Sequence, residues 1–138
     1  MPESGFVLDP RLEEIGHPIG NFPLCQVFLL DDARFPWVML VPRRANAAEI
    51  LDLDEADRLA LFNETLRAAE ALRAVSKPDK LNIGALGNIV RQLHVHIIGR
   101  FQSDPAWPGP VWGHGDRMPY PPHMVGPLMD RLARELGL

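Results

Sequence analysis

Two histidines, His94 and His96, stand two residues apart inside an apolar run at residues 92–98. On a β-strand alternate side chains project from the same face, so Gln92 would join both histidines in one polar stripe. The residues between them are apolar and can face a core: Leu93, Val95 and Ile97. Imidazole changes its charge near neutral pH, so this polar stripe carries groups suited to acid–base, nucleophilic or metal chemistry.

The pattern alone is compatible with three interpretations of the polar stripe. The residues can form the solvated face of a half-buried strand, which requires no chemistry. The two imidazoles can bind zinc or iron if a carboxylate or a third imidazole comes from elsewhere. Finally, one imidazole can be a nucleophile whose neighbours bind the charge that it attacks.

The composition predicts a single globular domain over residues 1–138, because a chain of 138 residues can bury a sufficient core without disulfides. Hydrophobic residues make up 46% of the chain and charged residues 23%, which is typical of globular proteins. The formal net charge of −4 argues against a surface for a nucleic-acid polymer. A small-molecule nucleotide remains a possible ligand.

The only cysteine, Cys25, cannot form an intramolecular disulfide, which favours a reducing compartment. The chain does not begin with a basic region followed by an apolar run, and no window is long and apolar enough to span a bilayer. We therefore expect a cytoplasmic protein that does not associate with membranes.

Periodicity and turn residues predict an α+β fold with an antiparallel sheet. The expected strands are residues 24–30, 37–41, 81–85 and 92–101, and a long helix should run from about 55 to 75. Its apolar stripe consists of Leu59, Phe62, Leu66, Ala69 and Leu72. Short helices are expected at 10–15 and 125–136, so residues 102–138 form a Pro-rich loop and a C-terminal helix.

Residues 92–98, which follow a Gly87-Asn88 turn, resemble the motif His-φ-His-φ-His-φ-φ of the histidine triad (HIT) family of nucleotide hydrolases and transferases. His94 and His96 match the second and third histidines of that motif, and Gln92 stands in place of the first. Residues 38–43 are similar to the family's strand that ends in Leu-Val-Ile-Pro-Lys. The resemblance covers about residues 25–107. It implies a HIT-like fold and, with Gln-x-His-x-His, the diadenosine polyphosphate hydrolase-like branch.

The resemblance also implies several nucleotide-binding residues. Asp31 or Asp32 would accept hydrogen bonds from a ribose, and Asn82 and Asn88 are candidate phosphate contacts. Trp107 follows the motif much as a Trp-Pro-Pro segment does in some members, where that loop approaches the partner subunit's site. Trp112 is the alternative for that role.

The comparison with the family gives two further points. Trp37 falls where many family members carry another histidine. The resemblance also implies a homodimer, and the long helix and the Leu-rich C-terminal segment are both suited to an interface.

The mechanism implied is attack by a neutral imidazole nitrogen of His94 on the α-phosphorus of a nucleotide, which gives a nucleotidyl-histidine intermediate. The other ring nitrogen of His94 should be held by a main-chain carbonyl of the neighbouring loop. His96 would donate hydrogen bonds to phosphate oxygens or to the leaving group. Gln92 can orient a phosphate or water but cannot shuttle a proton, which favours dinucleoside polyphosphates over phosphoramidates. No metal or other cofactor is expected.

Two alternatives remain beside this mechanism. A metal-dependent hydrolase would use His94 and His96 with either His114 or His123 as ligands, although no acidic residue stands at a favourable spacing. A nucleotide-binding module with little turnover would result if Gln92 and Trp37 replaced the groups that handle protons.

Overall fold

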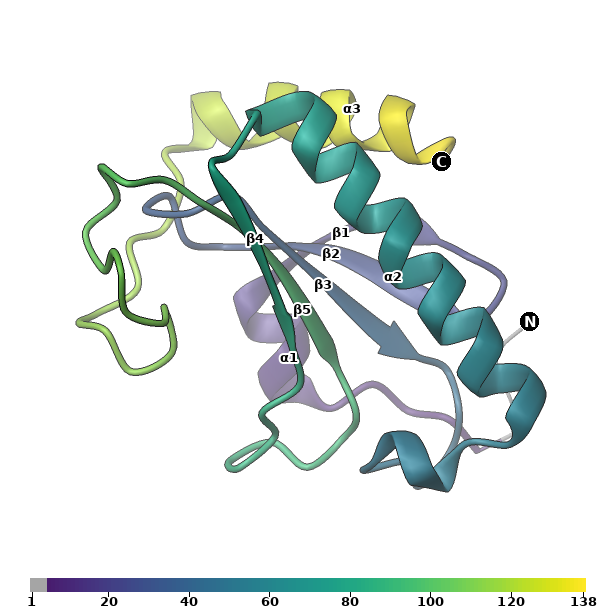
Figure 1. The fold of residues 1–138 in the computed structure, drawn as a ribbon. Helices are drawn as coiled ribbons and strands as arrows, with labels where there is room; N and C mark the ends of the chain where they lie inside the picture. The colour runs from purple at the N-terminus through teal and green to yellow at the C-terminus, as the bar shows by residue number, and fades with distance from the viewer. Residues whose placement is uncertain (1–4) are drawn as a thin grey trace.

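The computed structural model describes residues 5–138 and contains a five-stranded antiparallel sheet with the strand order β1-β2-β3-β5-β4 (Figure 1). The strands are β1 (Gly16–Asn21), β2 (Cys25–Leu30), β3 (Trp37–Pro42), β4 (Lys80–Gly84) and β5 (Val95–Arg100). The helices are α1 (Pro10–Ile15), the 3-10 turn η1 (Ile50–Asp52), α2 (Glu55–Ser76) and α3 (Pro122–Leu136). The predicted α+β class with one long helix and shorter flanking helices is thereby confirmed.

Strand β1 was not expected from the sequence. It contains Gly16, Pro18 and Gly20, which are uncommon inside strands, and its register with β2 shifts between Pro18 and Gly20. Proline can occupy this position because β1 is an edge strand of the sheet. Tertiary pairing with β2 therefore overrides a weak local preference.

The two faces of the sheet build two separate cores. Helices α2 and α3 cover one face, where Leu93, Val95 and Ile97 are buried as their alternation predicts (Figure 1). Helix α1 covers part of the other face, where Leu12 packs in the same cluster as Ile98. The strand itself begins at Val95, three residues later than expected, so His94 lies directly before β5.

Helix α2 begins after Asp54, whose side chain accepts a hydrogen bond from Asp57 N, and ends at Lys77 in the left-handed conformation. Its predicted apolar stripe is only partly correct. Ala69 and Leu72 are buried, whereas Leu59, Phe62 and Leu66 are exposed. The helix instead turns small or polar residues toward the sheet: Glu64, Thr65 and Ala68.

Glu64 explains why this polar face of α2 can be buried. Its two carboxylate oxygens accept hydrogen bonds from the backbone N–H groups of Leu24, at 3.0 Å, and Cys25, at 2.8 Å. A buried carboxylate that is hydrogen-bonded in this way avoids most of its desolvation cost. The contact fixes α2 to the beginning of β2.

The Pro-rich segment between β5 and α3 is held by a buried ion pair. Arg100 donates to Asp104 at 2.8 Å and also to the backbone oxygen of Gly109. Burial raises the pKa of Asp104, but hydrogen bonds from Arg100 and from three backbone N–H groups outweigh it and lower the pKa to about 2. These bonds around Arg100 and Asp104 hold the loop against the sheet face that carries His96.

Helix α3 begins at Pro122, three residues earlier than expected, because Pro122 suits the first helical position and Pro127 is accommodated inside the helix.

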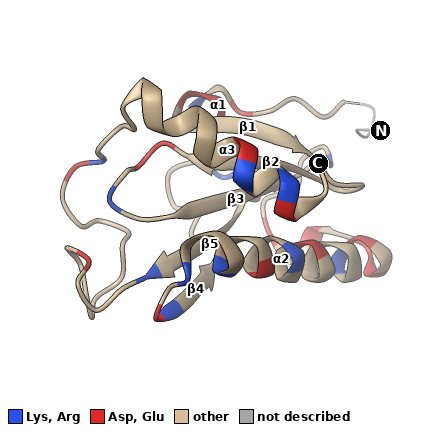
Figure 2. Cartoon of the chain, turned by 90° about the horizontal axis from the view of Figure 1, so that it is seen from above, with Lys and Arg blue, Asp and Glu red and all other residues tan. Residues whose placement is uncertain are grey.

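Charged residues of both signs alternate along α2, so this surface has no basic face (Figure 2). Within residues 5–138, no helix combines the length and apolar character that crossing a membrane requires.

Candidate functional site

His94 and His96 border a cavity of about 620 Å³ on the α1 side of the sheet. Three other segments complete its wall. They are loop residues 86–90, the Pro-rich loop at Pro110, Trp112 and Gly113, and helix α1 at Leu12 and Ile15. The histidine rings lie edge to face with their centroids 4.9 Å apart, so both imidazoles are available to one ligand in this cavity.

The tautomer of His94 follows from one contact. Its Nδ1 atom lies 2.6 Å from the backbone oxygen of Gln92. A carbonyl oxygen only accepts hydrogen bonds, so Nδ1 carries a proton, and the neutral form of the ring has its lone pair on Nε2. The predicted main-chain partner for His94 is therefore present, and the free nitrogen is the one suited to nucleophilic attack.

His96 is buried deeper and has a different partner. Trp37 of β3 donates its indole N–H to Nδ1 of His96 at 2.9 Å. Burial, followed by the neighbouring His94, lowers the pKa of His96 to about 3. The Trp112 ring also lies edge to face, 5.7 Å from the His96 ring. His96 is thus a neutral side chain that contacts two indoles.

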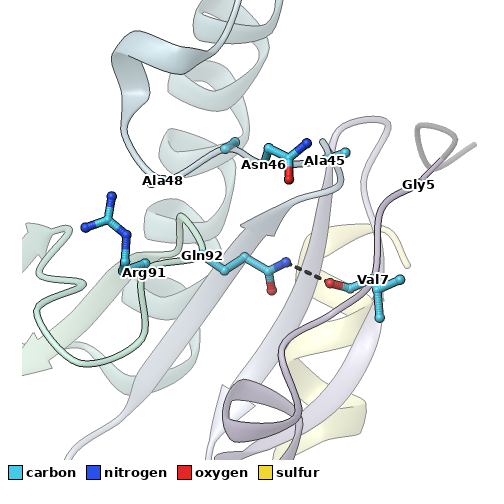
Figure 3. Close-up of a pocket in the computed structure, with 8 residues that line it drawn as sticks. Gly5, Val7, Ala45, Asn46, Ala48, Arg91 and Gln92 are labelled. Carbon is cyan, nitrogen blue, oxygen red and sulfur yellow. Dashed lines mark hydrogen bonds between the residues drawn. The ribbon is translucent and has the colours of Figure 1, made fainter.

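Gln92 is not among the residues that line this cavity. Its side-chain nitrogen donates to the backbone oxygen of Val7, and its side-chain oxygen accepts from the N–H of Asp9, both at 2.8 Å. Figure 3 shows Gln92 pointing toward Val7 in a separate pocket that includes Asn46 and Arg91. Residues 92–94 lie outside the strand, so the alternation that would place Gln92 beside the histidines does not apply there.

Asp31 and Asp32 are also absent from the cavity wall. Asp31 accepts from the backbone N–H of Tyr120 at 2.9 Å and pairs with His17 at 3.0 Å. Asp32 is buried and holds Arg34 through two hydrogen bonds. Burial raises the pKa of Asp32, but these bonds outweigh it and the net pKa is lowered. Both carboxylates have partners within the protein.

The two asparagines predicted to contact phosphate lie in different places in the structure. Asn88 lines the cavity in the loop before His94. Asn82 of β4 instead accepts a hydrogen bond from buried Arg100 at 2.8 Å. Of the two candidate tryptophans, Trp112 lines the cavity and Trp107 lies over the Arg100 guanidinium, 5.8 Å from ring centre to carbon.

Two features of the site were not identified from the sequence. The contact between Trp37 and His96 depends on the pairing of β3 with β5, which no local pattern reveals. The indole nitrogen of Trp112 is buried and has no hydrogen-bond partner among the residues that the structure describes. Trp112 itself was named from the sequence as the alternative to Trp107, because it lies in the Pro-rich loop that follows the motif.

The four histidines considered as metal ligands do not lie together in the structure. His114 and His123 are exposed, and neither lines the cavity with His94 and His96. Across residues 5–138, no group of three or more His, Cys, Asp or Glu side chains is arranged to hold a metal ion. The described residues thus offer no preformed site for the metal-dependent alternative.

Comparison with protein families matches residues 11–103 to the HIT domain. This chain belongs to the HIT domain family. Members of this family act on nucleotides, and His94 and His96 both lie within the matched residues.

Solved HIT structures resemble this chain over nearly its whole length. A histidine triad protein from Sinorhizobium meliloti 1021 is 48% identical, with a TM-score of 0.92, and the match covers 94% of this chain and 96% of that one. One from Bradyrhizobium japonicum is 45% identical, with a TM-score of 0.93 over 96% and 98%. One from Marinobacter aquaeolei VT8 is 40% identical, with a TM-score of 0.94 over 97% and 98%.

A more distant relative carries a named activity. The AP-4-A phosphorylase of Mycobacterium tuberculosis (strain CDC 1551 / Oshkosh) is 32% identical over 73 residues, which is 49% of this HIT protein. The matched region covers 37% of the phosphorylase. The HIT protein therefore corresponds to well under half the length of that curated relative.

Proposed function

We propose that this HIT protein is a nucleotide hydrolase or nucleotidyltransferase in which His94 attacks the α-phosphate of a nucleoside phosphate derivative, with dinucleoside polyphosphates as the favoured substrates. The observation that carries the proposal is the 2.6 Å contact between His94 Nδ1 and Gln92 O, since it leaves the Nε2 lone pair free beside the cavity. The distant likeness to an AP-4-A phosphorylase supports the same substrate class.

The reaction has two displacement steps. The Nε2 lone pair of His94 forms a bond to the α-phosphorus, the P–O bond to the leaving group breaks, and the leaving oxygen keeps the electron pair. Water or another acceptor then attacks the same phosphorus, the P–N bond breaks, and its electron pair returns to Nε2. In hydrolysis the proton of the attacking water goes to solvent. Nδ1 keeps its proton throughout both steps and donates it in a hydrogen bond to the Gln92 carbonyl oxygen.

Binding of the nucleotide draws on the other residues of the cavity wall. Asn88 precedes His94 in a Gly-containing turn, where amide N–H groups can face a phosphate. The Nε2–H of His96 supplies a further donor to phosphate oxygens. The buried indole N–H of Trp112, without a protein partner in residues 5–138, is the donor most in need of a ligand acceptor.

Trapping the intermediate tests this function. Wild-type protein is mixed with a labelled dinucleoside polyphosphate, quenched rapidly in base and analysed by mass spectrometry for an acid-sensitive adduct on His94. We expect the label on wild type and on His123→Gln, because His123 is an exposed helix residue away from the cavity. We expect no label on His94→Gln. Turnover by wild type without any adduct would overturn the covalent route.

A nucleotide-binding module with little turnover is the second candidate. It is favoured by the fact that Gln92 and Trp37, which stand in place of family histidines, cannot titrate and are engaged within the protein. Assays of purified protein against dinucleoside polyphosphates and nucleoside phosphoramidates separate the two functions. Nucleotide binding without turnover of either class would establish the module.

The partner that we propose is a second copy of this chain. Leu59 and Phe62 of α2 are 62% and 61% exposed, and Ile83 of the edge strand β4 is 48% exposed. Phe62 and Ile83 line one apolar hollow of about 320 Å³. An exposed apolar patch beside an open strand edge is typical of an interface, and a second β4 can pair with the first.

A further inference from the structure

The hydrogen bond between Trp37 and His96 joins the two central strands below the cavity. Trp37 lies on β3 opposite Ile98, and His96 lies opposite Met39 in the same antiparallel pair. The indole thus reaches diagonally across the ladder, and its N–H donates to His96 Nδ1 at 2.9 Å. Trp37 is 6% exposed and His96 is 5% exposed, so water does not compete for this bond.

The chemistry of indole makes this contact directional. The Nε1–H of tryptophan can only donate, in contrast to an imidazole nitrogen, which can also accept. Nδ1 of His96 must therefore present its lone pair, and the proton of the neutral ring is on Nε2. A second proton on Nδ1 would remove the acceptor that the Trp37 N–H requires.

The surroundings of His96 offer no compensation for a positive charge. Met39 on β3, Gly84 on β4 and the Trp112 ring are uncharged. Among the residues that the structure describes, His94 is the one titratable group whose charge acts on His96, and it opposes protonation. His96 therefore stays neutral at physiological pH.

We propose that Trp37 is a positioning residue that selects the Nε2–H tautomer of His96, and that this donor, which burial keeps neutral, restricts the site to leaving groups that depart as anions. The proposal rests on nucleotidyl transfer by His94 as the function of the site. Trp37 touches neither substrate nor the reacting atoms, and it acts only through His96.

The restriction follows from the fate of the proton. A neutral imidazole can donate a hydrogen bond through Nε2–H but cannot give up that proton, because an imidazolate would remain. When a phosphoanhydride P–O bond breaks, the leaving phosphate oxygen keeps the electron pair and departs as an anion without a proton. When a phosphoramidate P–N bond breaks, the amine nitrogen must gain a proton, and His96 cannot supply it.

Nitrogen NMR of protein with ¹⁵N-labelled histidine tests the positioning role directly. In wild type we expect His96 as a single Nε2–H tautomer whose ring shifts do not change between about pH 5 and 8. Trp37→Phe removes the donor that selects this tautomer, so we expect a mixture of Nδ1–H and Nε2–H tautomers, while burial still keeps the ring neutral. Trp112→Phe is the matched control, because it changes the other edge contact of His96 without touching the hydrogen bond, and its tautomer should remain that of wild type.

A second replacement guards against a packing effect of Trp37→Phe. Benzothienylalanine at position 37 keeps the bicyclic shape of tryptophan and replaces only the N–H by sulfur. We expect the same mixed tautomers as in Trp37→Phe. A single Nε2–H tautomer in a folded protein with either replacement would overturn the proposal.

Substrate selectivity forms the second arm of the test. We expect wild-type kcat/KM for a dinucleoside tetraphosphate to exceed that for a nucleoside phosphoramidate by about 100-fold or more, the usual scale of general-acid assistance. With benzothienylalanine at position 37, part of His96 presents its Nε2 lone pair in place of the N–H donor, so kcat/KM for the tetraphosphate should fall by about twofold or more, in proportion to the share of the Nδ1–H tautomer. An unchanged kcat/KM together with an altered tautomer would overturn the role of the donor, and a wild-type ratio near one would overturn the restriction on leaving groups. If wild type acts on neither substrate, the proposed function fails, and the NMR arm still decides the role of Trp37.

Discussion

Gln92 holds His94 through its main chain: the Gln92 carbonyl oxygen lies 2.6 Å from His94 Nδ1. The side chain of Gln92 turns the other way and bonds the backbone of Val7 and Asp9. A single residue thus orients the His94 ring with its carbonyl and holds the N-terminal segment with its side-chain amide. Any residue type at position 92 can provide the carbonyl. Few side chains can both donate to the Val7 oxygen and accept from the Asp9 N–H, as the Gln92 amide does.

Replacement of Gln92 by Ala should therefore affect stability more than chemistry. The Asp9 N–H and the Val7 carbonyl each lose a partner, and we expect the free energy of unfolding to fall by about 1–3 kcal/mol. The value of kcat should change by less than about tenfold, well under the loss typical of a catalytic acid or base. Urea unfolding and steady-state kinetics on the same preparation measure both. A large fall in kcat with unchanged stability would instead return Gln92 to the catalytic machinery.

Stability should decrease as the pH falls below the ordinary pKa of histidine, because His96 binds a proton only in the unfolded chain. Its pKa is about 3 in the folded protein and 6.5 in the reference state, so its contribution is complete above pH 6.5 and is lost as the pH falls toward 3. The slope from this group is about 1.4 kcal/mol per pH unit, or about 2 kcal/mol between pH 7 and 5.

Urea unfolding at pH 7, 6 and 5 measures this loss. The window lies above the range in which the aspartates with lowered pKa, such as Asp32 and Asp104, begin to contribute. His96→Gln is the control and should have a flatter dependence over the same window. Equal slopes for the two proteins would show that His96 does not titrate as proposed.

Asn82 and Asn88 should give opposite results on replacement by Ala. Asn82→Ala leaves one N–H of buried Arg100 without an acceptor, so the free energy of unfolding should fall by about 1–3 kcal/mol with little change in KM. Asn88→Ala removes an exposed cavity residue, so KM should rise by about tenfold, the value of one hydrogen bond to a charged group, with little change in stability. Kinetics and thermal unfolding of the pair provide the comparison. A raised KM in Asn82→Ala without destabilisation would place Asn82 against the substrate after all.

Replacement of Phe62 by Glu should convert a dimer to a monomer without unfolding it, since Phe62 is exposed in a single chain. A charge placed in the apolar hollow between α2 and β4 opposes burial against a second copy. Analytical ultracentrifugation over a range of protein concentrations gives the oligomeric state. Met118→Glu, an exposed methionine in the loop before α3, is the matched control and should remain dimeric. A monomeric wild type, or a dimeric Phe62→Glu, would exclude this face as the interface.

Local sequence patterns predicted the parts of the site that depend on neighbours in the chain. The alternation from Leu93 to Ile97 identified which side chains enter the α2 core, and Asp54 marked the start of α2. A main-chain carbonyl of the neighbouring loop was also expected as the partner of His94, and the structure shows that Gln92 provides it. In each case the determining contact lies within one element or one turn.

Contacts between distant segments were not predictable in the same way. Asp31 and Asp32 are carboxylates of the kind that can bind a ribose. In the structure, however, Arg117 and Tyr120 donate hydrogen bonds to Asp31, and Arg34 donates to Asp32. The partner of His96 is 59 residues away in the chain and depends on the register of two strands. A sequence pattern does not contain that register.

Glu64 accepts hydrogen bonds from the N–H groups of Leu24 and Cys25, so the start of β2 is held by a helix as well as by its pairing with β3. These two amide hydrogens can exchange with solvent only when α2 separates from the sheet. Hydrogen exchange at positions 24 and 25 therefore measures the opening of α2, and we expect both amides to exchange together with those of the helix interior as one cooperative unit.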